Sequence, residues 1–510
     1  MPMEPRQTIG ELLQTVAEKR ARHPAIVDEA GSLTWAKFVE RIRSTAHALA
    51  SIGLKQGERV ALLLPPSRRY LETDYGIMAG GFVRVPIDPR SPLDDVAALI
   101  RSSGARALAT TPDRASQARR LFPELQFALS VGGNAAGAQD FDMLVDAARD
   151  VPFPEFDPDA LATINYSGGT TGAPKGITLS HVNLTTVLAH ASRAFEITQS
   201  AVFLNVRPLW PIAQLVTMAH LAAGARVVLE SGFDPTRLAD QIAASRATRT
   251  SLVPTQLFRL LDRLTPDDPR LARLEAIYIG GSRLAPDVFR RALTLIGPKI
   301  GVLYGMTEAP ISSYLTPRLA ASLEEARSSV GFAVPGCEIR ISDGTGSFAE
   351  PRAVGEVIIR GSHVMKGYWR DEEATRSALR DGWLHTGDLG TLAEDGRLEI
   401  VGRIKDVIRS GAQSIVPAEV EDVLFSHPAV EDVAVLGLPD EEWGEIVAAF
   451  VVRKARIEIT GQDLDEFCRS RLAGFKRPRA FRFVSRIPRS HYGKPQRAVL
   501  LDEASNEQSC

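Results

Sequence analysis

The chain has little cysteine and no excess of charge of one sign. Its three cysteines, Cys337, Cys468 and Cys510, are far apart and lack metal-type spacing. This excludes a disulfide framework and favours a reducing compartment. The 60 basic and 62 acidic residues give a formal net charge of −2. Such a balance gives no support for a nucleic-acid surface or a polybasic membrane patch.

Long apolar runs are also lacking. No stretch is long enough to span a bilayer, and the first residues, Met1 to Arg6, lack the apolar core of a signal peptide. The run Val60–Leu64 is apolar but short, which is typical of a buried strand. We therefore expect a cytoplasmic protein with neither a membrane nor a nucleic-acid partner.

The 510 residues are too many for one simple core, so two or more folding units are expected. The first part alternates helix-like segments, such as 35–52 and 70–79, with strand-like segments such as 59–64. This alternation predicts an α/β fold with doubly wound sheets covered by helices. From about residue 320, short strands separated by Asp-Gly and Gly-Ser turns indicate a β-rich subdomain. The last hundred residues are typical of a compact α+β unit.

Residues 166–176 read Tyr-Ser-Gly-Gly-Thr-Thr-Gly-Ala-Pro-Lys-Gly. Glycines let successive backbone N–H groups converge on one anion, and hydroxyls and an ammonium group add donors and positive charge. The pattern is not a Walker loop, because no Gly-Lys-Ser/Thr follows four spacer residues. A mobile turn after the apolar run 161–164 is the alternative. We predict a phosphate-binding loop made by Ser167, Gly168, Gly169, Thr170, Thr171, Gly172 and Lys175.

Four further motifs follow the loop. They are Tyr-Gly-Met-Thr-Glu at 304–308, Trp-Leu-His-Thr-Gly-Asp at 383–388, Gly-Arg-Ile-Lys-Asp at 402–406 and Gly-Lys at 493–494. In this order, the set closely resembles the superfamily of adenylate-forming enzymes (the ANL superfamily), which includes acyl-CoA synthetases, peptide-synthetase adenylation domains and beetle luciferases. The resemblance covers about residues 30–500. It implies ATP, Mg²⁺ and coenzyme A as cofactors and a small carboxylic acid as substrate.

The resemblance assigns the nucleotide to the large N-terminal domain. The loop would hold the β- and γ-phosphates, Tyr304 beside Gly305 would stack on adenine, and Thr307 would donate to the α-phosphate. Glu308 would hold Mg²⁺, which prefers carboxylate and phosphate oxygens. Without the other motifs, a surface salt bridge would be the favoured interpretation of Glu308. Adenine would approach the backbone at Gly280, Gly281 and Ser282, although a glycine pair is also common in a strand-to-helix turn.

The remaining motifs imply ribose contacts and a mobile second domain. Asp388 would accept from the ribose hydroxyls, and Arg403 would approach ribose and phosphate. In isolation these two residues could be a turn cap and a solvated charge. Lys494 would bridge the attacking carboxylate and the phosphate. Asp406 would be the hinge between domains 1–405 and 406–510, with a β-rich subdomain at about 320–400. A second pose would bring Gly411 to the thiol.

Two positions depart from the superfamily pattern. Gly168 stands where a serine is frequent, which removes one hydroxyl from the phosphate loop. Ala412 stands where a glycine is frequent and adds a methyl group where a pantetheine arm would pass. We expect weaker holding of pyrophosphate from the first change and a less efficient thiol half-reaction from the second.

The acid pocket should be lined by the segment 209–214, with help from Ser282 and Met306. Residues 201–220 contain no carboxylate to bind an α-ammonium group, so a free amino acid is a poor candidate. Apolar side chains here favour an apolar or aromatic acyl group, although each could equally be plain core. The pocket residues predicted from this segment are Trp210, Pro211 and Gln214.

The sequence therefore predicts an ATP-dependent acid–thiol ligase that makes acyl-CoA. The alternative is an adenylating enzyme that loads an acyl carrier protein. A luciferase-like oxygenase and a nucleotide-binding regulatory protein without catalysis are further candidates. Retention of Lys494, Glu308 and Asp388 argues against loss of catalysis.

Overall fold

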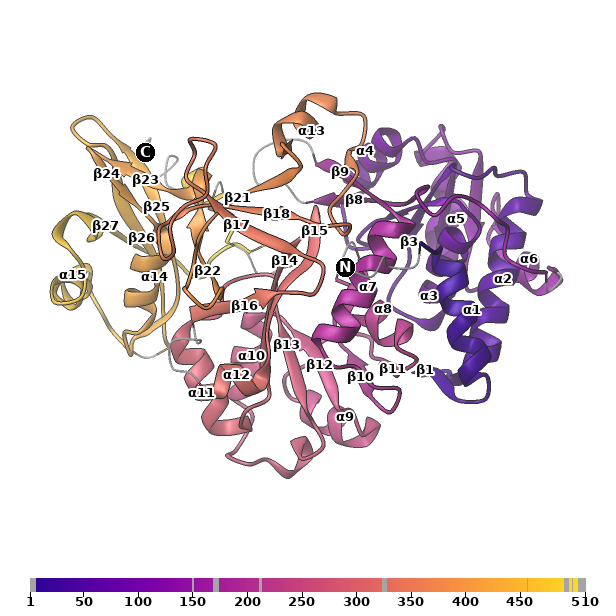
Figure 1. Ribbon diagram of the computed structural model, residues 1–510, viewed down its shortest axis with the longest axis horizontal. Helices are drawn as coiled ribbons and strands as arrows, with labels where there is room; N and C mark the ends of the chain where they lie inside the picture. The colour runs from indigo at the N-terminus through magenta and orange to yellow at the C-terminus, as the bar shows by residue number, and fades with distance from the viewer. Residues whose placement is uncertain are drawn as a thin grey trace.

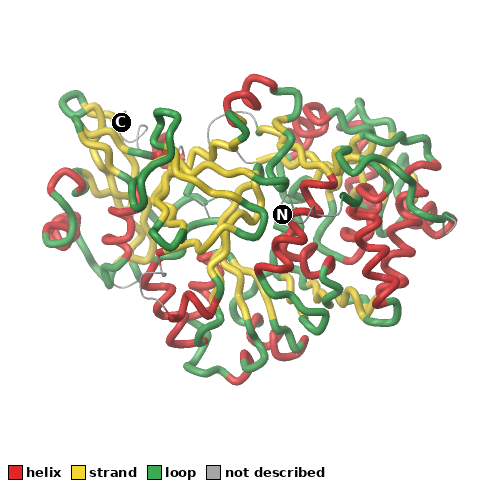
Figure 2. The backbone as a smooth tube through the Cα atoms, viewed as in Figure 1, coloured by secondary structure: helices red, strands yellow, loops and turns green. Residues whose placement is uncertain are grey.

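The structure is a computed structural model that describes residues 6–148, 151–167, 174–210, 213–322, 328–455, 457–489, 495–497 and 499–502. Its strands form three sheets. The early part of the chain lies at one end of the elongated molecule and the late part at the other (Figure 1). Figure 2 shows helices gathered around the strands of the N-terminal part and a strand-rich centre. The mixed α/β fold confirms the predicted class.

The first sheet has eight strands in the order β19-β9-β8-β4-β3-β5-β6-β7. Its central pairs are parallel, whereas β8 with β9 and β9 with β19 are antiparallel. Buried apolar runs such as residues 60–63 suit a parallel strand, which is covered on both faces. The strands are β3 (Arg59–Leu63), β4 (Val83–Pro86), β5 (Ala107–Thr110), β6 (Phe127–Ser130), β7 (Gln139–Asp140), β8 (Leu161–Ser167), β9 (Lys175–Ser180) and β19 (Gly367–Tyr368).

The second sheet has fourteen strands and changes character along its length. Neighbouring strands are parallel along the path β1-β11-β10-β12-β13-β14. They are antiparallel along the path β14-β15-β16-β22-β21-β18-β17. The strands are β1 (Pro24–Asp28), β2 (Gly31–Thr34), β10 (Val202–Asn205), β11 (Arg226–Leu229), β12 (Arg249–Leu252), β13 (Ala276–Ile279), β14 (Ile300–Met306), β15 (Ala309–Leu315), β16 (Ser329–Ala333), β17 (Glu338–Ser342), β18 (Gly355–Arg360), β20 (Leu379–Arg380), β21 (Trp383–Leu392) and β22 (Leu398–Arg403). The predicted β-rich region is thus the antiparallel end of this sheet, and the β15–β16 pair connects it to the rest of the sheet.

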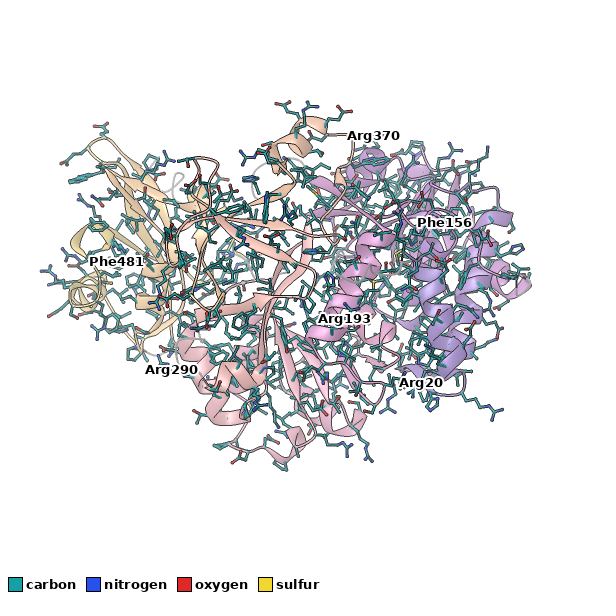
Figure 3. All side chains as sticks on the ribbon, viewed as in Figure 1. Arg20, Phe156, Arg193, Arg290, Arg370 and Phe481 are labelled. Atoms are coloured by element: carbon teal, nitrogen blue, oxygen red, sulfur yellow. The ribbon has the colours of Figure 1, made fainter. Side chains whose placement is uncertain are left out.

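The third sheet begins at Ile408, shortly after the predicted hinge. Its order is β24-β23-β26-β25, and β27 pairs with β26. The strands are β23 (Ile408–Ser410), β24 (Gln413–Ile415), β25 (Val430–Asp440), β26 (Gly444–Arg453) and β27 (Ala480–Phe483). Two small apolar cores lie on this unit, and Phe425 is one of its side chains that also packs on the core of the second sheet. Figure 3 shows Phe481 in this unit and Phe156 near the opposite end of the molecule.

Fifteen α-helices are present among the described residues. They are α1 (Ile9–Arg20), α2 (Trp35–Ser51), α3 (Arg68–Ala79), α4 (Leu93–Ser103), α5 (Pro112–Leu121), α6 (Phe141–Ala147), α7 (His181–Ala194), α8 (Leu215–Ala222), α9 (Leu238–Ser245), α10 (Pro254–Leu261), α11 (Pro286–Ile296), α12 (Pro317–Ser322), α13 (Glu372–Ala378), α14 (Pro417–Phe425) and α15 (Gly461–Arg469). Within the described ranges, none of them combines the length and the apolar character needed to cross a bilayer. The predicted helix over 35–52 is α2, and the one over 70–79 lies within α3.

Candidate active site

The Tyr-Gly-Met-Thr-Glu motif ends strand β14 and forms a tight hairpin with β15. Met306 pairs with Ala309, so Thr307 and Glu308 make the two-residue turn. A Cβ atom on Gly305 would lie 2.5 Å from the backbone nitrogen of Ile311, which makes glycine necessary at this position. The hairpin therefore holds the predicted nucleotide and metal residues on a short, closely packed backbone.

Asp388 contacts two other predicted nucleotide-binding residues, Tyr304 and Arg403, so the three form one cluster. It lies on β21 opposite Arg403 on β22. One carboxylate oxygen accepts from the Tyr304 hydroxyl at 2.8 Å, and the other accepts from Nε of Arg403 at 2.9 Å. Burial and the charge of Asp388 raise the pKa of Tyr304 well above its ordinary value, so the phenol stays protonated and donates.

Tyr368 lies between Glu308 and Lys175, and Lys175 is at the end of the hairpin that carries the predicted phosphate loop. The Tyr368 hydroxyl donates to Oε1 of Glu308 at 3.0 Å, and the ammonium group of Lys175 lies 5.0 Å from the Tyr368 ring centroid. Strand β19, which contains Tyr368, pairs with β9, which begins at Lys175. Burial, with the charge of Glu308, raises the pKa of Tyr368 above its ordinary value.

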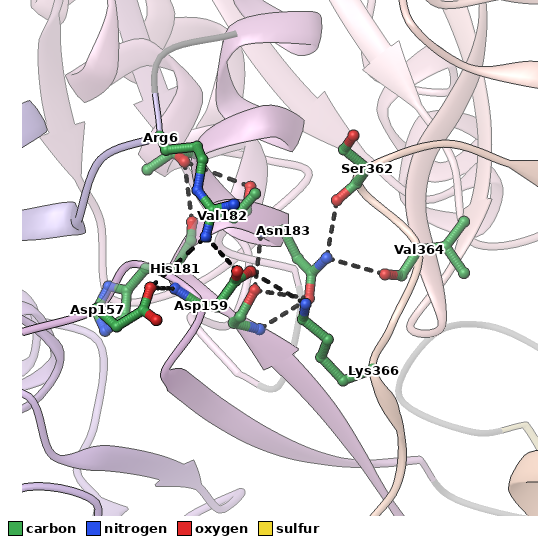
Figure 4. Close-up of polar contacts among 11 residues, drawn as sticks. Arg6, Asp157, Asp159, His181, Val182, Asn183, Ser362, Val364 and Lys366 are labelled. Carbon is green, nitrogen blue, oxygen red and sulfur yellow. Dashed lines mark hydrogen bonds and ion pairs between the residues drawn. The ribbon is translucent and has the colours of Figure 1, made fainter. Parts of the chain in front are cut away.

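The segment that leads into β19 is fastened to the N-terminal part by polar contacts (Figure 4). The side-chain amide of Asn183, in the first turn of α7, donates to the backbone carbonyls of Ser362 and Val364 at 2.8 and 3.0 Å. Lys366 pairs with Asp159 at 3.1 Å. The backbone N–H of Met365 also donates to the Glu308 carbonyl at 2.8 Å. These bonds fix Tyr368 between Lys175 and Glu308.

The phosphate loop itself lies mostly outside the described residues. Gly168, Gly169, Thr170, Thr171 and Gly172 fall in the gap 168–173. The backbone on either side is described, because Ser167 pairs with Lys175 at the end of the β8–β9 hairpin. The loop is therefore closed by a two-stranded hairpin, and the exposed Lys175 lies at its end.

A cleft of about 1050 Å³ separates the N-terminal part from the unit that begins at Ile408. Trp210 and Ser282 line it on one side, and Asp432, Arg489 and Pro495 line it on the other. Lys494 and Pro211 lie outside the described residues. Arg489 and Pro495 flank the undescribed segment 490–494, so the chain enters and leaves that segment at the cleft.

The predicted adenine residues follow strand β13, and the predicted acid residue Met306 ends strand β14. A Cβ atom on Gly280 would lie 2.5 Å from the Leu303 side chain, and Gly281 has a φ of +93°, so both positions favour glycine. Met306 is half-buried at the end of β14. Gln214 is fully buried, and its amide donates to Asp74 at 3.2 Å. Contact of Gln214 with an acid stays a prediction.

Asp406 and Gly411 lie at the start of the C-terminal unit. Asp406 ends the short 3₁₀ helix Ile404–Asp406, and its carboxylate accepts from Arg497 at 3.2 Å. Gly411 is exposed, has a φ of +59° and donates its N–H to the Trp443 carbonyl at 2.7 Å. Gly411 does not line the cleft in this pose.

Glu308 fits the binding of a magnesium ion through one oxygen. Its Oε1 is held by Tyr368, and within the described ranges Oε2 has no hydrogen-bond or ion-pair partner. Across those same ranges, no three His, Cys, Asp or Glu side chains gather as a metal-binding cluster. A single protein carboxylate suits Mg²⁺, which takes its remaining ligands from substrate phosphates and water.

Sequence reasoning did not identify Tyr368, Asp74 or Arg84. Tyr368 belongs to a two-residue strand without a recognisable motif. Arg84 offered a signal, since it is a charge within the apolar strand 82–86, and a buried arginine requires partners. Its ion pair with Asp74 is 3.0 Å long, and both side chains are fully buried.

Comparison with known proteins gives concordant matches over nearly the whole chain. A model of the AMP-binding enzyme family matches residues 13–369, and a model of the AMP-binding enzyme C-terminal domain matches residues 419–494. A feruloyl-CoA synthase of Amycolatopsis is 33% identical over 93% of this chain and 96% of its own length. A fatty acid–[acyl-carrier-protein] ligase of Streptomyces coeruleorubidus is 31% identical over 97% of this chain and 96% of its own length. The crystal structure of ATP-bound MatB from Rhodopseudomonas palustris superposes with a TM-score of 0.89 and 28% identity, over 98% of this chain and 99% of that one.

Proposed function

This chain belongs to the AMP-binding enzyme family and is an AMP-forming acid–thiol ligase that uses ATP and Mg²⁺. We propose that it activates an aromatic carboxylic acid bound at the cleft between its two parts. Similarity to a feruloyl-CoA synthase supports an aromatic acid. The apolar side chain of Trp210, which lines the cleft, supports the same class.

In the first half-reaction, a carboxylate oxygen of the acid attacks the α-phosphorus of ATP, and the bond to pyrophosphate breaks. Both reactants are anions, so aimed donors and positive charge are required where they meet. We assign this role to Lys494, Lys175, Thr307 and the phosphate loop. The observation that carries the assignment is that Arg489 and Pro495, on either side of the segment containing Lys494, line the same cleft as Trp210 and Ser282.

Nucleotide binding falls to the cluster centred on Asp388. At present its carboxylate accepts hydrogen bonds from Tyr304 and Arg403. On nucleotide binding, one of these bonds would be replaced by a bond from a ribose hydroxyl. Glu308 would hold Mg²⁺ through Oε2 while Tyr368 fixes Oε1. The ion neutralises phosphate charge when bound. We assign the adenine contact to the backbone at Gly280 and Gly281, which follow the end of β13.

In the second half-reaction, the thiolate sulfur attacks the acyl carbon, and AMP leaves with the electron pair of the acyl–oxygen bond. We assign the thiol path to Gly411, which is exposed and away from the cleft in this pose. A rotation near Asp406 between domains 1–405 and 406–510 would exchange Lys494 for Gly411 at the cleft.

The acceptor is proposed to be free coenzyme A, with an acyl carrier protein as the alternative. Similarity to the fatty acid–[acyl-carrier-protein] ligase favours the alternative. A panel of cinnamic, benzoic and medium-chain fatty acids, assayed by ATP–pyrophosphate exchange with and without coenzyme A, tests both statements. We expect exchange with aromatic acids and an acyl-CoA product. Exchange without any acyl-CoA would instead support carrier loading.

A further inference from the structure

Helix α3 is bonded to Leu209 and to Gln214, which lie on either side of the undescribed residues 211 and 212. The Tyr70 hydroxyl donates to the Leu209 carbonyl at 2.9 Å. The Asp74 carboxylate accepts from the Gln214 amide at 3.2 Å. Residues four apart lie on one face of a helix, so Tyr70 and Asp74 provide two anchor points on one rigid element. Leu209, next to Trp210, and Gln214 are therefore both held by one face of the same helix.

Asp74 also connects this segment to the strand that carries the phosphate loop. Its carboxylate accepts from Arg84 at 3.0 Å. The same guanidinium group donates to Thr163 and Asn165 on β8, each at 3.0 Å. Strand β8 ends at Ser167, where the loop begins. A guanidinium group has a planar, rigid arrangement of donors, so the three partners are held at fixed relative positions.

Stability alone gives little reason for this network. Within the described residues, Oε1 of Gln214 and Nδ2 of Asn165 are buried without a hydrogen-bond partner. An unsatisfied buried polar group destabilises the folded state. A buried ion pair is often no more stabilising than apolar residues of the same volume. Local rules of packing are commonly broken where geometry serves a site.

We propose that Tyr70, Asp74 and Gln214 are positioning residues that set the place of Leu209, and with it the neighbouring Trp210, relative to strand β8, and so determine the affinity of the enzyme for its acid. This inference rests on the proposed function, because it takes Trp210 as a wall of the acid site. The bonds to Leu209 and Gln214 hold the wall, and Arg84 transmits its position to β8.

Two variants and a matched control test the proposal. Tyr70→Phe removes the hydroxyl that holds Leu209, and Gln214→Met removes the amide while keeping length and packing. Thr110→Val is the control, because the buried Thr110 hydroxyl donates to the Leu63 carbonyl at 2.9 Å on β5, away from the segment. We expect the KM for the acid to rise about tenfold in both test variants, the size of one lost hydrogen bond. The KM for ATP should stay within about twofold of wild type.

A third variant adds a readout that a merely structural role would not move. Gln214→Glu places a second carboxyl group against Asp74, with Arg84 as the facing cation and the phenols of Tyr70 and Tyr75 nearby. Two adjacent carboxyls share one proton at low pH and repel each other when both are ionised. The ratio of acid KM in this variant to that in wild type should therefore rise with pH.

The outcomes separate the inference from the function on which it rests. An active wild type with unchanged acid KM in Tyr70→Phe and Gln214→Met overturns the inference. So does an equal rise in Thr110→Val, or a KM ratio for Gln214→Glu that does not depend on pH. Failure of the wild type to exchange pyrophosphate with any acid refutes the proposed function instead.

Discussion

The Tyr304 hydroxyl donates to the Asp388 carboxylate at 2.8 Å, although the two residues are 84 positions apart. Tyr304 comes from the hairpin of β14 and β15, and Asp388 comes from β21. The bond therefore brings the parallel and antiparallel regions of the second sheet together at the proposed nucleotide site. The same carboxylate accepts from Arg403. Its two oxygens are the acceptors on which proposed ribose binding depends.

Replacing Asp388 by asparagine should raise the KM for ATP by about tenfold to a hundredfold, because the charge and one acceptor are lost. The KM for the acid should change little. Asp395→Asn is the control, since Asp395 is an exposed aspartate in the turn of the same β21–β22 hairpin and pairs with Arg397 at 2.6 Å. Steady-state kinetics with varied ATP measures the effect. Equal changes in both variants would contradict the assigned role.

Replacing Tyr368 by phenylalanine should raise the Mg²⁺ concentration needed for half-maximal activity by several fold. The ring against Lys175 is kept, but the hydroxyl that orients Glu308 is removed. Mg²⁺ titration of pyrophosphate exchange at saturating ATP measures this. Tyr278→Phe, which removes a buried hydroxyl bonded to Arg249 at 2.9 Å, controls for loss of stability. An unchanged Mg²⁺ requirement in Tyr368→Phe would show that Tyr368 does not orient a metal ligand.

Lys494→Ala should slow acyl-adenylate formation greatly while sparing thioester formation from supplied acyl-AMP. The ammonium group acts where charge builds between carboxylate and phosphate, which is a feature of the first step alone. Single-turnover assays of each half-reaction measure the split. Equal damage to both halves would refute a role confined to the first.

Gly411→Leu should have the opposite effect. A Cβ atom at this position would lie 3.3 Å from the Trp443 ring, and the φ of +59° disfavours any side chain. Adenylate formation should continue while thioester formation from acyl-AMP falls. Normal thioester formation in this variant would place the thiol path elsewhere.

The buried Asp74 gives a pH dependence of stability with a defined sign. Burial raises the pKa of Asp74 from 3.8 to about 6, against the opposing charge of Arg84. The folded protein therefore binds this proton more tightly than the unfolded chain does. The resulting stabilisation is fully present below about pH 4 and is lost as the pH rises through about 6, an effect of about 3 kcal/mol.

Urea unfolding of wild type and Asp74→Asn across this range measures the effect. Because asparagine does not titrate, the free energy of unfolding of wild type minus that of the variant should fall as the pH rises from about 4 to about 7. Other titrating groups cancel in the difference. A difference that is constant or rises with pH would contradict the raised pKa.

The α/β fold follows from local sequence patterns, and the residues of the proposed nucleotide cluster follow from short motifs that resemble those of the superfamily. Alternating apolar segments predicted the covered sheets, and short motifs contain Tyr304, Glu308, Asp388 and Arg403. The contacts that join these motifs could not be predicted from the sequence. Tyr368 reaches Glu308 across 60 residues, and Gln214 reaches Asp74 across 140. No periodicity specifies such pairings, and the crossing of β19 from the late chain to β9 is a topological feature.

The most direct test of the central claim follows oxygen from the acid into the nucleotide. With an ¹⁸O-labelled carboxylic acid, ATP and coenzyme A, mass spectrometry should find one labelled oxygen in AMP and none in pyrophosphate. Attack of the carboxylate on the α-phosphorus leaves its oxygen on the phosphate when the thiol displaces AMP. Release of ADP and phosphate, or AMP without label, would contradict the account.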